Sequence, residues 1–263
     1  MSIVIAIPTN PLFAPLVANA DRVAKEIGAR IIRGTEQECH GYLGRHIADV
    51  ALVTPLGYAQ ESLKTDLRIL PVSALTLDAL TYIGSMYLHQ NASSDTFERC
   101  ASPHAQDFLM QMGVGVLSEK FDMELQFEQV QGSVAELLAK YDAVLDYGFD
   151  AAQSVALDIS DEWSDYFGEI LPLALWVCRP EEVPEEIADI VEQFRDAEIS
   201  LRQEITEIEH NGTSAYRNGV LSFEWTEETE EALQHTIELL YYWQYVPRVA
   251  ATKLWGRDVV ERV

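Results

Sequence analysis

Hydrophobic residues occur along the chain in two kinds of stretch, short continuous or alternating runs and longer segments with helical spacing. The short runs are typical of β-strands and predict strands at 2–8, 29–33, 48–56, 67–77, 80–88, 97–101, 124–130, 143–147 and 171–178. Apolar positions three and four residues apart predict helices at 11–27, 35–46, 102–117, 134–140, 184–210 and 226–245. Gly28 follows the first helical segment, as a C-cap glycine does.

Strands that alternate with helices predict an α/β fold with mostly parallel sheets. The N-terminal part of the chain, up to residue 88, is rich in predicted strands and is followed by a polar segment at 89–98. The C-terminal part is helical. This organisation predicts two lobes. We expect the first lobe to comprise 1–88 and 176–263 and the second to comprise 89–175. Ligands of such folds bind in the crevice at the carboxyl ends of the strands.

Three strand-to-helix junctions resemble one another, each with a small polar residue followed by proline: Asn10-Pro11, Thr54-Pro55 and Ser102-Pro103. Such residues cap helices, and proline is favoured at the first helical position. A fourth junction offers Asp150 as a cap. Helix N-termini at one sheet edge would hold a small anion through backbone N–H groups, although a capped helix also needs no ligand.

Charge limits the partners of this 263-residue chain. Asp and Glu number 43 against 18 Lys and Arg, so the net charge is -25. Phosphate backbones and anionic lipid would be repelled, which argues against nucleic-acid or membrane-surface binding. The acidic segment at 183–210 is interpreted as a solvated helix face, with a partner-binding surface as the alternative.

Several other classes of protein lack support in the sequence. No apolar run approaches the roughly 20 residues that span a bilayer, and the N-terminus has no basic signal region, which predicts a cytoplasmic protein. The three cysteines form no CxxC, and His40 and His46 lack a third ligand in spacing, so no metal is predicted. No G-x-S-x-G, P-loop or G-x-G-x-x-G motif is present, and no cofactor is expected.

Three segments resemble the menaquinone-biosynthesis MqnA/MqnD family. They are ADVALVTPLGYAQ with DLRILP at 48–71, a spaced set at 158–180, and the C-terminal SLRQEITEIE and LSFEWTEETEEALQHTIELLYYW. The spaced set consists of Asp158, Trp163, Gly168, Trp176, Arg179 and Pro180. The resemblance covers nearly the whole chain. It implies a type II periplasmic-binding-protein fold and a carbon–oxygen lyase of the chorismate dehydratase type in the futalosine route to menaquinone.

The resemblance also implies where the pocket lies. Asn10 is the best match to the family's N-terminal asparagine, and Ser85 is the one serine where the family has a serine-rich strand. Gly148 matches the glycine of a Gly-Asp pair, but here Phe149 follows it and Asp150 comes one position late. The family's Ser-Arg-Thr-Ser junction is reduced to Ser102-Pro103-His104. These departures fall in the expected pocket.

Chorismate dehydration needs a base for the ring proton, a donor to the leaving hydroxyl and clamps for the carboxylates. We expect Asn10, Thr54 and Ser102 to be the donors. Three residues are candidate acids or bases: Asp150, Asp146 in an otherwise apolar strand, and His104, whose expected place in a first helical turn favours neutral imidazole.

Two function hypotheses follow, and both have a small anionic carboxylate as the ligand. One is the lyase, and the alternative is a non-catalytic cytoplasmic protein that binds an anionic solute with the same fold. The lyase needs a base within reach of the ligand, whereas the binding protein needs only donors. The aromatic cluster at 241–245 is interpreted as core packing or as a homodimer contact.

Overall fold

The computed structural model describes residues 3–89, 98–148, 156–205 and 219–257. The chain divides into two compact units. Unit 1 comprises Met1–Thr76, Pro172–Gln203 and Ser222–Val263, and unit 2 comprises Leu77–Leu171 and Glu204–Leu221. The hydrophobic pattern assigns 77–88 to the first lobe, whereas the contacts group this segment with unit 2, because its strand pairs with two strands of that unit.

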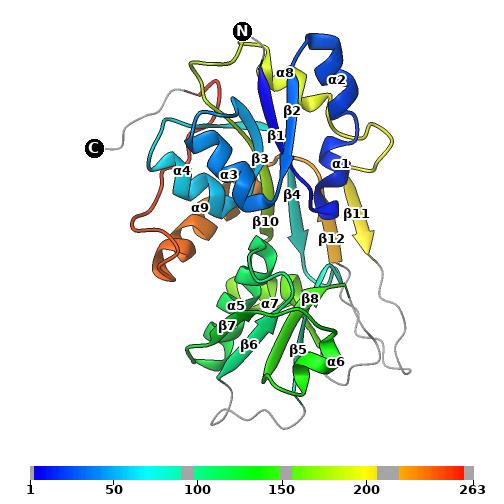
Figure 1. Ribbon diagram of the computed structural model, residues 1–263, viewed down its shortest axis with the longest axis vertical. Coiled ribbons are helices and arrows are strands. Elements are labelled where there is room, and N and C mark those ends of the chain that lie inside the picture. The colour runs from blue at the N-terminus through cyan, green and yellow to red at the C-terminus, as the bar shows by residue number, and fades with distance from the viewer. Residues whose placement is uncertain (1–2, 90–97, 149–155, 206–218, 258–263) are drawn as a thin grey trace. The chain divides into compact units, whose positions relative to one another are not determined.

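The larger sheet contains seven strands in the order β11-β12-β4-β10-β3-β1-β2 (Figure 1). Their bounds are β1 (Val4–Pro8), β2 (Arg30–Gly34), β3 (Val50–Val53), β4 (Arg68–Asp78), β10 (Leu171–Cys178), β11 (Arg202–Ile205) and β12 (Gly219–Ser222). Strand β1 is parallel to β2 and β3, and β3 is antiparallel to β10. All residues of β3 and β10 are buried, as their continuous apolar runs predict.

Helices cover the strands of unit 1. Helix α3 packs against β1, β2 and β3 and against α4, which in turn contacts α9 (Figure 1). The helices of this unit are η1 (Pro11–Phe13), α1 (Ala14–Val17), α2 (Ala20–Ile27), α3 (Glu36–Gly44), α4 (Pro55–Ser62), α8 (Ile187–Glu192) and α9 (Glu227–Tyr242). Gly28 ends α2 in the left-handed conformation, with φ of 71°, and confirms the predicted C-cap.

Unit 2 contains a five-stranded sheet in the order β7-β6-β8-β5-β9. Its strands are β5 (Gly84–Leu88), β6 (Arg99–Ser102), β7 (Gln126–Gln129), β8 (Ala143–Tyr147) and β9 (Ala156–Asp158), and its helices are α5 (Phe108–Phe121), α6 (Val134–Leu138) and α7 (Ile159–Phe167). Strand β6 is parallel to β7 and β8, whereas β5 is antiparallel to β8 and β9. Both sheets are therefore mixed, within an α/β fold.

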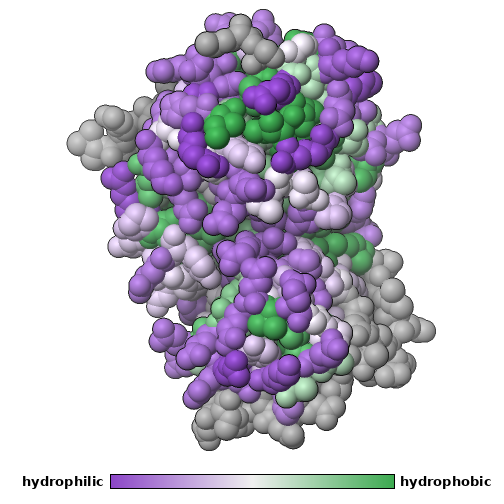
Figure 2. Space-filling view, in the orientation of Figure 1, coloured by the Kyte–Doolittle hydropathy of each residue, from purple (hydrophilic) through white to green (hydrophobic). Residues whose placement is uncertain are grey.

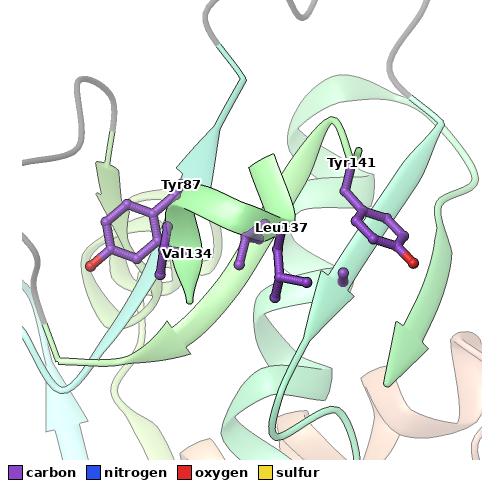
Figure 3. Packing of buried hydrophobic residues seen from close by; sticks show 6 residues of the cluster. Tyr87, Val134, Leu137 and Tyr141 are labelled. Carbon is purple, nitrogen blue, oxygen red and sulfur yellow. The ribbon is translucent and has the colours of Figure 1, made fainter. Parts of the chain in front are cut away.

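The two faces of the unit 2 sheet carry different helices. On one face, Val134 and Leu137 of α6 pack with Tyr87 and Val144 of the strands (Figure 3). On the other face, α5 approaches closely, since a Cβ at Gly113 would lie 2.4 Å from the Leu145 Cδ2. Because side chains alternate along a strand, every second residue of β8 faces α6.

Two predicted helices are wrong in part. The helix expected at 184–210 is limited to α8, and the chain then forms strand β11, in which Gln203 and Ile205 are half-buried and Arg202 and Glu204 are exposed. This period of two fits a strand, whereas the wider spacing of the segment mimicked a helix. Residues 206–210 lie outside the described part. The helix expected at 102–117 begins only at Phe108.

The face in Figure 2 is mostly hydrophilic, with one broad hydrophobic patch in the upper part of the view and smaller ones elsewhere. The aromatic cluster at the end of α9 is divided, because Tyr241 and Tyr242 are exposed while Trp243 and Tyr245 are half-buried. Core packing is therefore wrong for the first two tyrosines, and a homodimer contact stays a prediction. No helix in the described ranges is long and apolar enough to cross a bilayer.

Candidate functional site

Asn10 begins η1 in unit 1, as predicted. Its Oδ1 accepts a hydrogen bond from the Leu12 N–H at 3.0 Å, which confirms the cap. Its Nδ2 donates to the Glu36 Oε1 at 2.8 Å. Glu36 is only 4% exposed, at the first turn of α3. The amide that the sequence predicts as a ligand donor is thus bonded to a buried carboxylate.

Thr54 begins α4 in the same unit, and its Oγ1 accepts from the Gly57 N–H at 3.2 Å. His40 lies behind this cap, with its Nε2 3.2 Å from the Thr54 Oγ1. The Thr54 N–H donates to the same nitrogen at 3.4 Å, so the ring proton belongs on Nδ1. Burial lowers the pKa of His40 to about 3, and the ring is therefore neutral at pH 7.

Glu36 and His40 were missed by sequence reasoning as partners of the two caps. They lie four residues apart in α3, which places both on one helix face. Thr35 and Glu38 form a capping box at the start of this helix, and this local signal could have fixed its register. Within the residues described, no group of His, Cys, Asp or Glu is arranged to hold a metal ion.

Ser102 does not cap a helix, so the third predicted junction is wrong. Its buried Oγ accepts from the His104 N–H at 2.9 Å, and the chain turns until Asp107 before α5 begins. His104 therefore lies outside the first turn of the helix. The dipole argument for a neutral His104 loses its geometric basis.

His104 instead lies at the carboxyl edge of the unit 2 sheet, between two carboxylates. Its Nδ1 is 3.8 Å from the Asp107 Oδ2, and its Nε2 is 3.7 Å from the Asp146 Oδ1. Tyr147 donates its hydroxyl to Asp107 at 3.0 Å and packs edge-on against the imidazole. The His104 side chain is 47% exposed and that of Asp146 is 25% exposed, so both are open to a ligand.

Ser85 lies next to Asp146 on the neighbouring strand. The register pairs Ser85 with Asp146 on β8 and with Asp158 on β9, and directly paired residues point to the same face. Ser85 is 1% exposed, and no described group is hydrogen-bonded to its Oγ. Together with His104, these residues form a line across the sheet edge, which we name the polar row: Asp158, Ser85, Asp146 and His104.

Asp158 belongs to the polar row but is occupied by the local fold. Its Oδ1 accepts from the Asp161 N–H at 2.9 Å, and its Oδ2 accepts from the Tyr82 N–H at 2.7 Å. Burial raises the pKa of this carboxyl. Asp158 is therefore a helix cap, whereas Asp146 accepts one hydrogen bond from the described residues, from the Tyr147 N–H.

Gly148 follows the last residue of β8, two residues after Asp146, with φ of 74°, and its N–H donates to the Ile83 carbonyl at 2.8 Å. This left-handed conformation explains the glycine without a ligand. Asp150, the third acid–base candidate, lies outside the described residues.

The spaced set at 158–180 has structural roles. Trp163 and Trp176 are fully buried, and Gly168 ends α7 in the left-handed conformation. Arg179 is also buried, and it donates to the Ala48 carbonyl and pairs with Asp49. These four residues support the fold and are not part of the polar row, to which only Asp158 of the set belongs.

Comparisons with solved structures show the fold. Protein AF1704 from Archaeoglobus fulgidus is similar with a TM-score of 0.58 and 14% identity, over 93% of this chain and 98% of that one. The periplasmic aliphatic sulphonate binding protein SsuA from Escherichia coli matches with a TM-score of 0.58 and 9% identity, over 97% of each chain. SsuA from Xanthomonas axonopodis pv. citri, bound to MOPS, matches at 0.50 and 9%, over 95% of each.

No protein-family model matches the sequence, and no curated protein matches it. The sequence resemblance to the menaquinone-biosynthesis enzymes therefore has no support from these two comparisons. The structural matches lie far below the identity at which activity is shared. The chain has the type II periplasmic-binding-protein-like α/β fold.

Proposed function

We propose that this chain binds a small organic molecule at the carboxyl edge of the unit 2 sheet, with His104 and Asp146 in contact with it. Two proteins of the same fold are named for sulphonate binding, which supports a binding role. One observation carries the proposal. The buried Ser85 Oγ has no hydrogen-bond partner among the described residues and lies beside the open His104–Asp146 pair.

An unpaired buried hydroxyl loses its hydrogen bonds to water without replacement, at a cost of about 1–3 kcal/mol. Such groups are rare in folded proteins and call for an explanation. A ligand at the polar row gives Ser85 a partner and recovers this free energy only in the complex. The Ser85 hydroxyl therefore destabilises the free protein and makes a favourable contact in the complex.

The test uses ligand-detected NMR with a defined mixture of carboxylates, sulphonates, amines and amino acids. We expect saturable binding of at least one compound by the wild type and its loss in His104→Ala. The matched control is His235→Ala, on α9 of unit 1, which keeps the binding. Equal binding by wild type and His104→Ala, or no binding of any compound, would contradict the proposal.

A lyase of the chorismate dehydratase type is the second candidate, favoured by the contact between His104 and Asp146. An imidazole beside a carboxylate is a common acid–base pair. In this reaction His104 takes the proton from the ring carbon that bears the enolpyruvyl ether, and the electron pair forms the new ring double bond. His104 passes this proton to the neighbouring hydroxyl, which leaves as water. The predicted ligand is then an anionic carboxylate.

Proton NMR of chorismate with the purified protein tests the lyase. We expect signals of 3-enolpyruvylbenzoate to appear with the wild type and with His235→Ala, and to disappear with His104→Ala. Unchanged chorismate excludes the lyase and leaves the binding role standing. Cytoplasmic location stays a prediction from the sequence.

A further inference from the structure

The geometry points to an ammonium group as the part of the ligand that the polar row receives, so the ligand is a small amine. This inference rests on the proposed function, because it names the ligand class for the same site. The side-chain groups at the row are carboxylates, a hydroxyl and one imidazole. These groups accept hydrogen bonds, and an ammonium group only donates them.

Charge is the first argument. Asp107 and Asp146 lie on either side of His104, and within the described ranges the one ion-pair partner of each is His104. No lysine or arginine among the described residues forms an ion pair with either carboxylate. A ligand carboxylate would add a further negative charge at this edge, whereas an ammonium group would reduce the repulsion between the two aspartates.

Hydrogen-bonding capacity is the second argument. Ser85 has a buried oxygen with free lone pairs, and it faces the same side of the sheet as Asp146. An ammonium group carries three donors. One can reach the Asp146 carboxylate and another the Ser85 Oγ, which would give the unpartnered hydroxyl its bond. Asp158, on the other side of Ser85, already accepts bonds from two backbone N–H groups.

The groups predicted to hold an anion are bonded or buried within the fold. Asn10 donates to Glu36, and Thr54 contacts His40, both within unit 1. In unit 2 the Ser102 Oγ is fully buried and accepts from the His104 N–H. Each unit therefore uses its predicted anion-binding groups in its own fold, which weakens the case for a carboxylate at the row.

The experiment compares two minimal probes of opposite charge, methylammonium chloride and sodium acetate, at constant ionic strength. Both probes are small and of similar size, so a difference in their binding reports mainly on charge. Protein NMR follows the backbone amides of Ser85 and Asp146 and the ring protons of His104. We expect saturable shifts at these three residues with methylammonium and none with acetate.

Two variants sharpen the result. Asp146→Asn keeps the shape of the side chain and removes its charge, and it should weaken methylammonium binding about tenfold or more, since a charge-assisted bond is lost. Ser85→Ala should weaken it less. Asp165→Asn is the matched control, because Asp165 is an exposed residue of α7 outside the polar row, and it should leave the binding unchanged.

The outcomes separate the two proposals. Saturable shifts with acetate but not with methylammonium would show that the ligand is not an amine, and they would still support a binding site at the row. Equal methylammonium affinity in Asp146→Asn and in the wild type also overturns the amine. If neither probe shifts the row while a carboxylate or sulphonate of the larger mixture binds and depends on His104, the assignment of an amine ligand is wrong and the binding role stands. If nothing binds at all, both are wrong.

Discussion

Unit 1 and unit 2 both place polar side chains at the carboxyl ends of parallel strands, but they use them differently. In unit 1, Asn10 and Thr54 cap helices. They contact Glu36 and His40, which are buried residues of α3. In unit 2, His104 stands half-exposed between two aspartates, and no helix begins at Ser102. The polar side chains at the unit 1 edge are hydrogen-bonded within the fold, whereas His104 and Asp146 at the unit 2 edge are accessible to a ligand.

This difference separates stabilising from binding roles. A polar group that is buried and fully hydrogen-bonded supports the fold, and its removal leaves a partner unsatisfied. An exposed group with loose contacts at 3.7 Å contributes little to folding. We therefore expect substitutions at the unit 1 edge to change stability, and substitutions at His104 and Asp146 to change binding.

Gly57→Ala should have the largest effect on stability. A Cβ at this position would lie 2.2 Å from the His40 Cδ2, so the buried ring would have to move away from Thr54. We expect the free energy of unfolding to fall by about 3 kcal/mol, measured by urea denaturation. In a His40→Ala background the same change should cost much less. An equal cost in both backgrounds would show that the ring does not restrict position 57.

The dependence of stability on pH should follow His40. Its pKa is about 3 in the folded protein and about 6.5 when unfolded, so between these values the unfolded state binds one more proton. Stability is therefore lost as the pH falls below 6.5, by up to about 1.4 kcal/mol per pH unit from this group. The measurement is urea denaturation at several pH values, with His40→Gln as the reference. Identical slopes for both proteins would contradict a buried neutral His40.

Asn10→Ala should have a smaller effect, about 1 kcal/mol, because it removes a cap and the hydrogen bond to Glu36. Asn10→Ser is the control, since serine can still cap but is too short to reach the carboxylate. We expect thermal unfolding to rank the wild type first, then Asn10→Ser, then Asn10→Ala. If serine is as stable as asparagine, the bond to Glu36 contributes nothing.

Continuous apolar runs predicted the buried strands well. The strand at 171–178 has the same bounds in the structure, because a strand buried on both faces needs an uninterrupted apolar sequence. The helix at 184–210 was predicted poorly, since its apolar residues fit a helical period while the segment from Arg202 pairs in a sheet. That pairing depends on β12 (Gly219–Ser222), which lies outside the segment 184–210, so the spacing within the segment does not reveal it.

The candidate site was predicted only in its local parts. Asn10 and Thr54 were predicted as caps from the proline that follows each, and the structure confirms both caps. Their partners lie 26 and 14 residues away, and no local pattern connects them. The contact of His104 with Asp146 depends on strands β6 and β8 being neighbours, which only the sheet order reveals. The ligand roles of Asn10, Thr54, His104 and Asp146 stay predictions.

His104→Ala should have the smallest effect on stability, within about 0.5 kcal/mol of the wild type. The side chain is 47% exposed, and its two carboxylate contacts are longer than hydrogen bonds. Removing the imidazole leaves Asp107 and Asp146 accessible to water, so neither carboxylate becomes a buried unpaired charge. Urea denaturation in the absence of ligand checks this. A loss above about 1 kcal/mol would mean that the imidazole stabilises the sheet edge. His104 would then have the same stabilising role as the unit 1 caps, which would contradict the contrast between the two units.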